Sequence, residues 1–284
     1  MKKLLSWARK LNPAIYIFST ILLMGIGFAL WRYSVMGVNT LLSPEKFTQY
    51  DVDFWNGVFT EFHGFLLDVL IFGLILTIYD LYRDKKERVE RWKEEIEDYR
   101  GWDEKEAIYR IVGNLKRLMR EQETPVDLRR YYLKGAMLYK AQLASLDFAY
   151  STLEKANLKD SNLEKANFWE ANLQNVNLQG ANLRRSALWY ANLQEANLKD
   201  AILTEAILHS TRLVGGNLHM ANLNGADLRG ANLQLANLQG ANLQQVDLEE
   251  ADLKSAIANE SQREDLIAAG VTEEMLAKIN WVAD

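Results

Sequence analysis

The chain of 284 residues contains no cysteine, three prolines and three histidines. The absence of cysteine excludes disulfides, thiolate metal sites and thiol nucleophiles, and it suits a reducing compartment. The histidines, at positions 63, 209 and 219, lie too far apart in the sequence to suggest a histidine-rich metal site. Basic residues are not in excess either, because 33 lysines and arginines face 38 acids. The net charge of -5 gives no strong positive field, so nucleic acid is not an expected partner.

The sequence also lacks the patterns that are typical of an active site. It contains no nucleophile–base pair, no phosphate-binding glycine loop and no metal-ligand spacing. We therefore expect no catalytic residue, no cofactor and no metal, and we predict that the protein is not an enzyme. The composition, 49% hydrophobic and 25% charged, is that of a folded chain.

Two long apolar runs are present near the N-terminus, at residues 11–31 and 62–79. The first carries no charge and is longer than the apolar core of a signal peptide, and the second carries only Asp68. About 20 such residues cross a hydrocarbon core of about 30 Å as a helix. Basic residues precede the first run and follow the second. By the positive-inside rule, residues 1–82 are predicted to form a two-span hairpin in the inner (cytoplasmic) membrane, with both ends in the cytoplasm and membrane lipid as a partner.

An acidic side chain inside a membrane span is costly, so Asp68 is expected to face another helix or water. Glu61 and Gly64 fall near the same helical face as Asp68. Two readings follow for this polar face: a packing residue within the membrane, or the lining of an ion pathway formed by an oligomer.

Residues 83–125 form a charged connector, with 12 bases and 12 acids between positions 83 and 123. One narrow apolar stripe marks its first half: Val89, Trp92, Ile96 and Tyr99. Gly101 interrupts this pattern, and Asp103 with Glu106 predicts a capping box that opens a second helix. The apolar face of that helix is Ile108, Ile111, Leu115 and Leu118. We expect this helix to cover the open end of the domain that follows.

From residue 136 to residue 255 the chain repeats every five residues without an insertion, which gives 24 pentads. The central residue is leucine in 22 of them and phenylalanine in two, Phe148 and Phe168. Two positions earlier, 16 of 24 residues are alanine, and the position between is Asn or Asp in 17 of 24. The same register extends less regularly back to residue 126.

A period of five fits neither an α-helix nor a pleated strand. A unit that turns a corner at each repeat can nevertheless place the alanine and the leucine inside every time. Four units then close a square coil of 20 residues, and the coils stack at about the 4.8 Å spacing of paired strands. The 24 pentads predict about six coils, with the alanines and leucines as the core.

This pattern resembles the pentapeptide-repeat family, and the resemblance covers residues 126–255. It implies an all-β, right-handed quadrilateral β-helix. The two apolar runs, the connector and the repeat together look like the membrane-associated bacterial members of the family. Some soluble members mimic DNA and bind type II topoisomerases, but their surfaces are markedly acidic. The present repeat has 13 acids and 10 bases, which makes DNA mimicry the third-ranked function.

Residues 256–284 follow the repeat and are expected to cap it. Residues 261–269 and 272–279 predict two short helices, with Gly270 closing the first and Thr272 opening the second.

Because residues 20 apart stack in a four-sided coil, one side of the rod collects a set of aromatic residues: Tyr150, Trp169, Trp189, Tyr190 and His209. Exposed aromatics are enriched at protein interfaces, although they also pack well on any β-surface. The leading hypothesis is therefore a non-catalytic, oligomeric, membrane-anchored scaffold whose cytoplasmic rod contacts itself and an unknown protein. The alternative is an oligomeric pore lined by the second span.

Overall fold

The computed structural model describes residue 27, residues 49–123 and residues 126–284. The first predicted span, residues 11–31, lies outside the described residues except for Gly27. The chain divides into two compact units, Met1–Arg88 and Val89–Asp284. The elements that position the candidate site all belong to the second unit.

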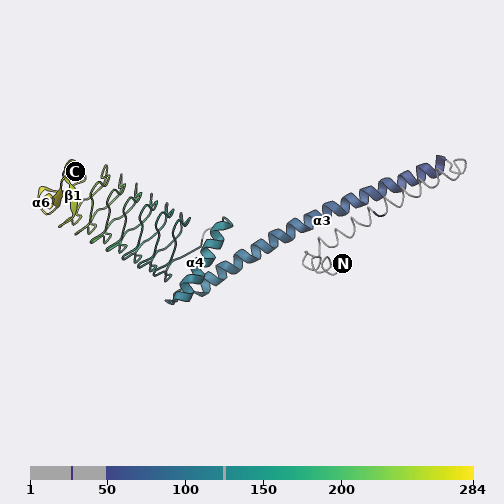
Figure 1. The fold of residues 1–284 in the computed structure, drawn as a ribbon, viewed down its shortest axis with the longest axis horizontal. Coiled ribbons are helices and arrows are strands. Elements are labelled where there is room, and N and C mark those ends of the chain that lie inside the picture. The colour runs from purple at the N-terminus through teal and green to yellow at the C-terminus, as the bar shows by residue number, and fades with distance from the viewer. Residues whose placement is uncertain (1–26, 28–48, 124–125) are drawn as a thin grey trace. The chain divides into compact units, whose positions relative to one another are not determined.

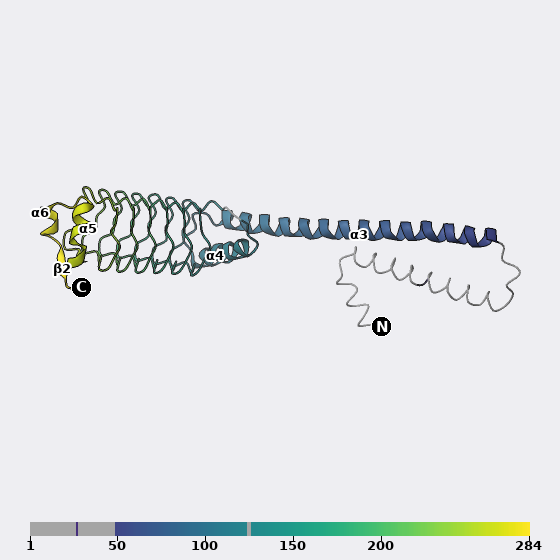
Figure 2. The same ribbon diagram turned by 90° about the horizontal axis from the view of Figure 1, so that it is seen from above.

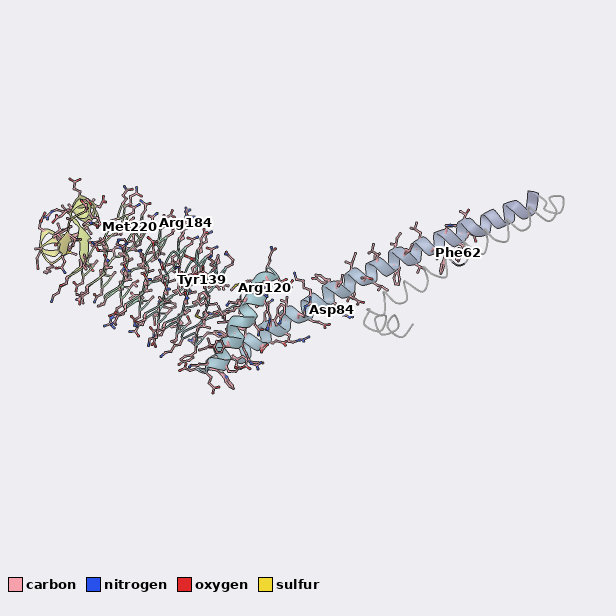
Figure 3. The ribbon with its side chains drawn as sticks, viewed as in Figure 1. Phe62, Asp84, Arg120, Tyr139, Arg184 and Met220 are labelled. Atoms are coloured by element: carbon pink, nitrogen blue, oxygen red, sulfur yellow. The ribbon has the colours of Figure 1, made fainter. Side chains whose placement is uncertain are left out.

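The N-terminal region is one long helix over the described residues, not the predicted hairpin. Helix α3 runs without interruption through Gln49–Asp98 and joins the predicted second span to the first half of the connector. No glycine or proline lies between Tyr79 and Asp98, and ion pairs spaced three or four residues apart, such as Arg83–Asp80 and Arg83–Glu87, support the helix where the predicted span meets the connector. Phe62 and Asp84 mark its apolar and charged parts (Figure 3).

Part of α3 is suited to a membrane by length and composition. The segment Thr60–Asp98 contains an 18-residue window of mean hydropathy 2.0, and none of that window is buried. This is the one helix of that kind in the described part of the chain.

The second helix of the connector, α4 (Lys105–Arg120), lies across the end of the coils at which the repeat begins (Figures 1 and 2). Its predicted apolar residues are buried, and they share one core with the end of α3 and with Leu128 and Tyr131 of the first coil. Helix α4 therefore lies over this end of the coils. The Tyr131 hydroxyl reaches Glu97 Oε2 at 3.0 Å, and the Arg100 guanidinium donates to the carbonyl of Arg129 at 3.2 Å.

The predicted capping box at the start of α4 is wrong. The N-cap residue is Glu104, whose side chain makes no capping hydrogen bond, and Glu106 instead accepts a hydrogen bond from Arg110 Nε at 2.9 Å. The helix is fixed by tertiary contacts in place of a cap. Asn114, which is fully buried, donates to Glu95 Oε2 of α3 at 2.9 Å. Gly101 does end the preceding segment, with a φ of +81°.

The repeat forms a rod of stacked 20-residue coils, as the period predicts. Parallel bridges join residues 20 apart, from Asp127↔Asp147 to Asn237↔Ile257. In each pentad the central residue donates to the next coil and its predecessor donates to the previous one. Leu198 N reaches the carbonyl of Asn217 at 2.8 Å, and Asn197 N reaches that of Val176 at 2.9 Å. The bridges at Asp127 and Tyr132 show that the two irregular pentads before residue 136 are part of the rod.

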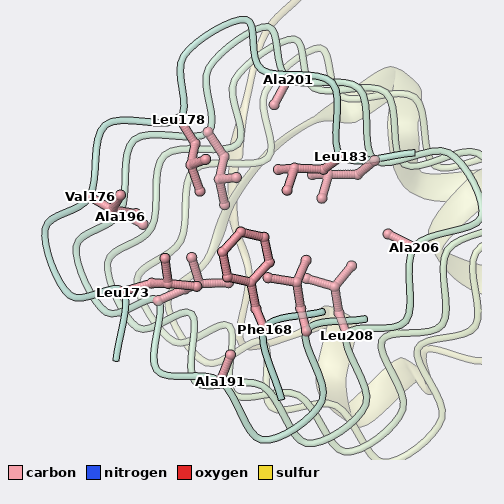
Figure 4. Packing of buried hydrophobic residues seen from close by; sticks show 14 of the residues in the cluster. Phe168, Leu173, Val176, Leu178, Leu183, Ala191, Ala196, Ala201, Ala206 and Leu208 are labelled. Carbon is pink, nitrogen blue, oxygen red and sulfur yellow. The ribbon is translucent and has the colours of Figure 1, made fainter. Parts of the chain in front are cut away.

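The core is the predicted column of alanines and leucines. Figure 4 looks along the rod interior, where Phe168, Leu173, Leu178 and Leu183 point toward the axis from successive sides of one coil. All four are fully buried. Alanine sits close to the wall because the backbone turns there and leaves no room for a longer side chain.

The corner of every pentad is made by a residue in the left-handed conformation. At each fifth position from Arg130 to Ser255, φ lies between +52° and +70°, and only six of these 26 residues are glycine. Glycines such as Gly225, with a φ of +68°, are therefore the exception at this position. Non-glycine residues are held in this conformation by the coil above, since the N–H of Lys155, for example, donates to the carbonyl of Gln174 at 2.9 Å.

The far end of the rod is closed by a small cap. It consists of β1 (Ile257–Asn259), a 3-10 turn (Glu260–Gln262), α5 (Arg263–Ala268), α6 (Glu273–Leu276) and β2 (Asn280–Val282). Helices occur in both predicted segments but are shorter than expected, because residues 261–262 belong to the 3-10 turn and residues 277–279 form a turn and a bend. The strand β2 then pairs in parallel with β1. Gly270 has a φ of +93°, and Thr272 Oγ1 accepts from the N–H of Met275, as the sequence indicated.

Candidate functional site: the aromatic face

Coils of four pentads give the rod four sides, and one of them carries most of the aromatic surface. We call this side the aromatic face, and it consists of the outward residues of seven stacked pentads: 126–130, 146–150, 166–170, 186–190, 206–210, 226–230 and 246–250. Each pentad is one level of the face. The levels are about 4.8 Å apart, the spacing of paired strands.

The five residues singled out from the sequence lie together on this face. The ring centroids of Tyr150 and Trp169 are 5.0 Å apart, and those of Trp169 and Trp189 are 6.4 Å apart. Tyr190 meets His209 edge to face at 6.1 Å. The rings thus form a strip over four consecutive levels. The two tyrosines and two tryptophans are between 37% and 55% exposed, so a large part of the strip is open to solvent.

Two apolar residues extend the strip. In most pentads the residue before the central leucine is Asn or Asp, and these side chains form ladders along the rod, as where Asn167 Nδ2 donates to Asp147 Oδ1 at 2.9 Å. On the aromatic face this ladder is interrupted by Ala187 and then by Ile207, which is 39% exposed. We did not single out these two from the sequence. The signal that identifies them is the loss of Asn or Asp in the same pentads that carry aromatic residues.

Local turn energetics do not explain the tyrosines. Tyr150 and Tyr190 occupy the left-handed corner, with φ of +60° and +58°. This position favours glycine and asparagine, and a bulky residue there costs on the order of 1 kcal/mol. The contacts of the rings outside the rod, such as the Arg130 guanidinium 5.6 Å above the ring of Tyr150, must offset that cost.

The strip is bounded at each end by an arginine between two aspartates. At the first end Arg129 pairs with Asp127 at 2.6 Å and approaches Asp147 at 3.7 Å. At the other end the same arrangement recurs five coils later: Arg229 pairs with Asp227 at 2.7 Å and approaches Asp247 at 3.5 Å. Hydrogen bonds from the guanidinium groups lower the pKa of Asp127 and of Asp227, so both carboxylates are charged at neutral pH.

The predicted polar face of the second span lies on α3. Glu61, Gly64 and Asp68 are all exposed, and their spacing places them on one side of the helix. A Cβ added at Gly64 would meet no atom within 4 Å. Among the described residues, none packs closely against Gly64 on this face of the helix.

Nothing on the aromatic face is arranged for metal binding or catalysis. Within residues 49–123 and 126–284 no group of three His, Cys, Asp or Glu side chains could hold a metal ion. His209 and His219 lie two pentads apart and therefore on opposite sides of the coil. The arrangement can bind another surface through rings and charged ends, but the described residues offer no nucleophile poised by a base.

The comparisons with known proteins concern the repeat. The family described as "Pentapeptide repeats" matches in eight copies between residues 141 and 261. No curated protein matches the chain. Among solved structures, HetL from Nostoc sp. strain PCC 7120, described as involved in heterocyst differentiation regulation, is 34% identical over 47% of this chain and 64% of its own, with a TM-score of 0.28.

Two further pentapeptide-repeat proteins of cyanobacteria are similar. Rfr23 from Cyanothece 51142 is 36% identical over 34% of this chain and 58% of its own, with a TM-score of 0.20. The protein alr5209 from Nostoc is 31% identical over 43% of this chain and 84% of its own, with a TM-score of 0.24. The chain thus spans less than two thirds of the length of HetL and of Rfr23. The uninterrupted five-residue register, the 20-residue bridges and the family match agree, and the chain belongs to the pentapeptide-repeat family.

Proposed function

We propose that this protein is a non-catalytic scaffold that is anchored to a membrane by its N-terminal region and that uses the aromatic face of its pentapeptide-repeat rod for protein contacts. The observation that carries the proposal is the strip of rings from Tyr150 to His209, which is partly open to solvent over four consecutive levels. Trp and Tyr are the residues most enriched at the centres of protein interfaces.

The chemistry of the other sides of the rod supports this assignment. On the side that contains residues 156–160, 176–180 and 196–200, the outward positions are Asn, Gln, Lys, Asp and Gly. Large apolar side chains are also exposed elsewhere on the rod, but Met137 and Tyr139 are confined to one pentad, and Met220 and Leu235 lie at other levels. Single exposed apolar residues are normal, whereas a contiguous patch marks an interaction site.

The membrane anchor rests on α3. Its apolar part is long enough to cross a bilayer, and none of the apolar window is buried by the protein itself. The basic residues Arg83, Lys85 and Lys86 follow this part directly and suit a cytoplasmic membrane surface. The rod would then lie in the cytoplasm, where a chain without cysteine is at no disadvantage.

The scaffold is tested by removing the two central rings. In the full chain, Trp169→Ala with Trp189→Ala should release a bound partner or lower the mass of the purified assembly. Truncation of an interfacial tryptophan commonly costs about 2 kcal/mol, or more than tenfold in affinity. The matched control is Met137→Ala with Tyr139→Ala, which removes two exposed apolar side chains from another side of the rod. If neither double variant changes the assembly mass or the copurifying proteins, the face is not a contact surface.

A second function, an oligomeric pore, has one observation in its favour. Asp68 is an exposed acid within the apolar part of α3, and such residues mark ion pathways in oligomeric channels. Full-length protein in lipid vesicles distinguishes the two functions, since a pore predicts ion flux that Asp68→Asn reduces. A scaffold predicts no flux for either form.

A further inference from the structure

Charged residues at the two ends of the aromatic face lie at equal distances along the rod from Trp189, and the two ends carry opposite charges. Trp189 follows Arg129 by 60 residues and precedes Glu249 by 60 residues, which is three coils in each direction. The first level of the face presents Arg129 and Arg130, and the last presents Glu249 and Glu250. All four side chains are exposed. The face is therefore basic at one end, aromatic in the middle and acidic at the other end.

We propose that the aromatic face binds the same face of a second copy of this chain, with the two rods antiparallel; this inference rests on the proposed scaffold function and names its partner. The two-fold axis lies between the two faces, runs perpendicular to the rods and passes the level of Trp189. It places the first level of one rod opposite the last level of the other. Residues that occupy the same position in their pentads, 20 residues apart in the chain, then face residues of that same position. Such self-complementary interfaces are the rule in homodimers.

The charges match in this arrangement. Arg129 of one rod meets Glu249 of the other, and Arg130 meets Glu250. On the neighbouring edge, Lys165 lies opposite Glu205, which its own chain pairs with Arg184 and Arg185, and Arg185 lies opposite Arg185 of the other rod. Opposite charges on facing surfaces favour one orientation over another and speed association.

The aromatic residues also find partners of their own kind. Trp189 meets Trp189 of the other rod at the axis, and Trp169 lies opposite His209. A fully desolvated cluster of rings at the centre, surrounded by charged residues at the rim, is the usual anatomy of a stable interface.

The aspartates at the two ends do not oppose the pairing. Asp147 of one rod lies opposite Asp227 of the other, and Asp127 lies opposite Asp247, but each of the four is already accompanied by an arginine of its own chain. Arg229 lies opposite Ala149, which is buried beneath side chains of its own rod and carries no charge that would oppose the guanidinium.

The parallel arrangement is disfavoured by the same charges. With the two-fold axis along the rod, every level meets itself, so that Asp247, Glu249 and Glu250 face three identical acids. Like charges in direct opposition are destabilising, and the acidic end of the face has only Arg229 to compensate them.

Cysteine cross-linking of the full chain in detergent tests the orientation, because the natural chain has no cysteine. Arg129→Cys with Glu249→Cys should give a disulfide-linked dimer under mild oxidation. Within one chain these positions are six coils, or about 29 Å, apart, and a disulfide requires Cα atoms within about 7 Å. An intramolecular bond is therefore excluded. Arg129→Cys alone and Glu249→Cys alone are the matched controls, and neither should cross-link.

Each outcome has a definite meaning. Cross-linking of Glu249→Cys alone would indicate parallel rods and overturn the proposal. If the double-cysteine variant stays monomeric while Trp169→Ala with Trp189→Ala releases a different protein, the face binds another partner; the self-pairing then fails and the scaffold survives. If the double-cysteine variant stays monomeric and the tryptophan variant changes nothing, both fail.

A charge exchange provides a second test that does not depend on disulfide geometry. Glu249→Arg with Glu250→Arg should raise the dimer dissociation constant at least tenfold, because four arginines then meet at each end of the pair. Adding Arg129→Glu with Arg130→Glu should restore it to within about threefold of the natural value. Loss without restoration, in variants with unchanged circular dichroism, would contradict the antiparallel pairing.

Discussion

Phe148 and Phe168 stack face to face inside the rod, with ring centroids 5.0 Å apart and planes inclined by 7°. Both are fully buried, and they occupy the central position that is leucine in all 22 remaining pentads from residue 136 to residue 255. They lie at the same two levels as Tyr150 and Trp169, whose rings meet on the outside of the wall. The strip of exposed rings therefore begins at the two levels that hold the buried phenylalanines.

The stacked pair should be energetically coupled. Phe148→Leu or Phe168→Leu alone should lower the free energy of unfolding by about 1 to 2 kcal/mol, because the remaining ring loses its partner and a void forms. The two together should cost less than the sum, since the stacking contact is lost only once. A double-mutant cycle measured by denaturant unfolding gives the coupling, and strict additivity would show that the rings do not stabilise each other.

The leucine column should tolerate no polar residue. Leu198 is fully buried, and Leu198→Asn places an amide where no hydrogen-bond partner is available. A loss of at least about 3 kcal/mol is expected from the cavity and the buried polar group. Glu195→Asn, at an exposed corner of the preceding pentad, is the control and should leave the melting temperature unchanged or raise it. An unchanged melting temperature for Leu198→Asn would contradict the stacked-coil core.

The left-handed corners predict opposite effects for two substitutions. Gly225 has a φ of +68°, and a Cβ added there meets only Glu205 Cγ at 3.7 Å, so Gly225→Ala tests conformation without a clash. We expect it to cost about 1 kcal/mol. Leu235, exposed and at a φ of +60°, should gain several tenths of a kcal/mol as Leu235→Asn, because asparagine adopts this conformation more readily. Thermal unfolding should show a lower melting temperature for Gly225→Ala and a higher one for Leu235→Asn.

The Arg229–Asp227 pair predicts a pH dependence at acid pH. Hydrogen bonding to Arg229 lowers the pKa of Asp227 below its ordinary value of 3.8. A carboxyl whose pKa is lower in the folded state adds stability that is complete above the unfolded pKa and is lost as the pH falls through the folded one. Arg229→Gln should therefore be less stable than the natural chain between pH 5 and 7, and the difference should shrink below about pH 4. A difference that is constant down to pH 2 would exclude this ion pair as its cause.

The membrane topology can be read with single cysteines. Ser43→Cys, which lies outside the described residues, should react with an impermeant thiol reagent on intact cells. Gln244→Cys, at an exposed position of the rod, should react only after the cells are opened. The natural chain is the blank, because it contains no cysteine. Labelling of Gln244→Cys on intact cells would place the rod outside.

The period of five determined the rod from the sequence alone. An uninterrupted register places residues 20 apart in contact, so the core column at Leu198 and the alignment of Trp169 with Trp189 follow from counting. This succeeds because a repeat contacts only its neighbours, and the fold is in effect one-dimensional. The caps were predicted as helices for a related reason, since their apolar spacing is visible over a few turns.

Tertiary structure decided what depends on contacts distant in the sequence. Helix α3 continues from the predicted second span into the connector because no residue stops it, and α4 begins without the predicted capping box because Asn114 and Glu95 tie it to α3. The left-handed conformation at corners such as Tyr190 is imposed by hydrogen bonds to the next coil, here to His209, against the local preference of a tyrosine. Likewise, β2 pairs with β1 because the last coil leaves an edge that only a strand can satisfy. Local propensity limits the conformations that a segment can adopt, and contacts with neighbouring parts of the chain determine which of them is formed.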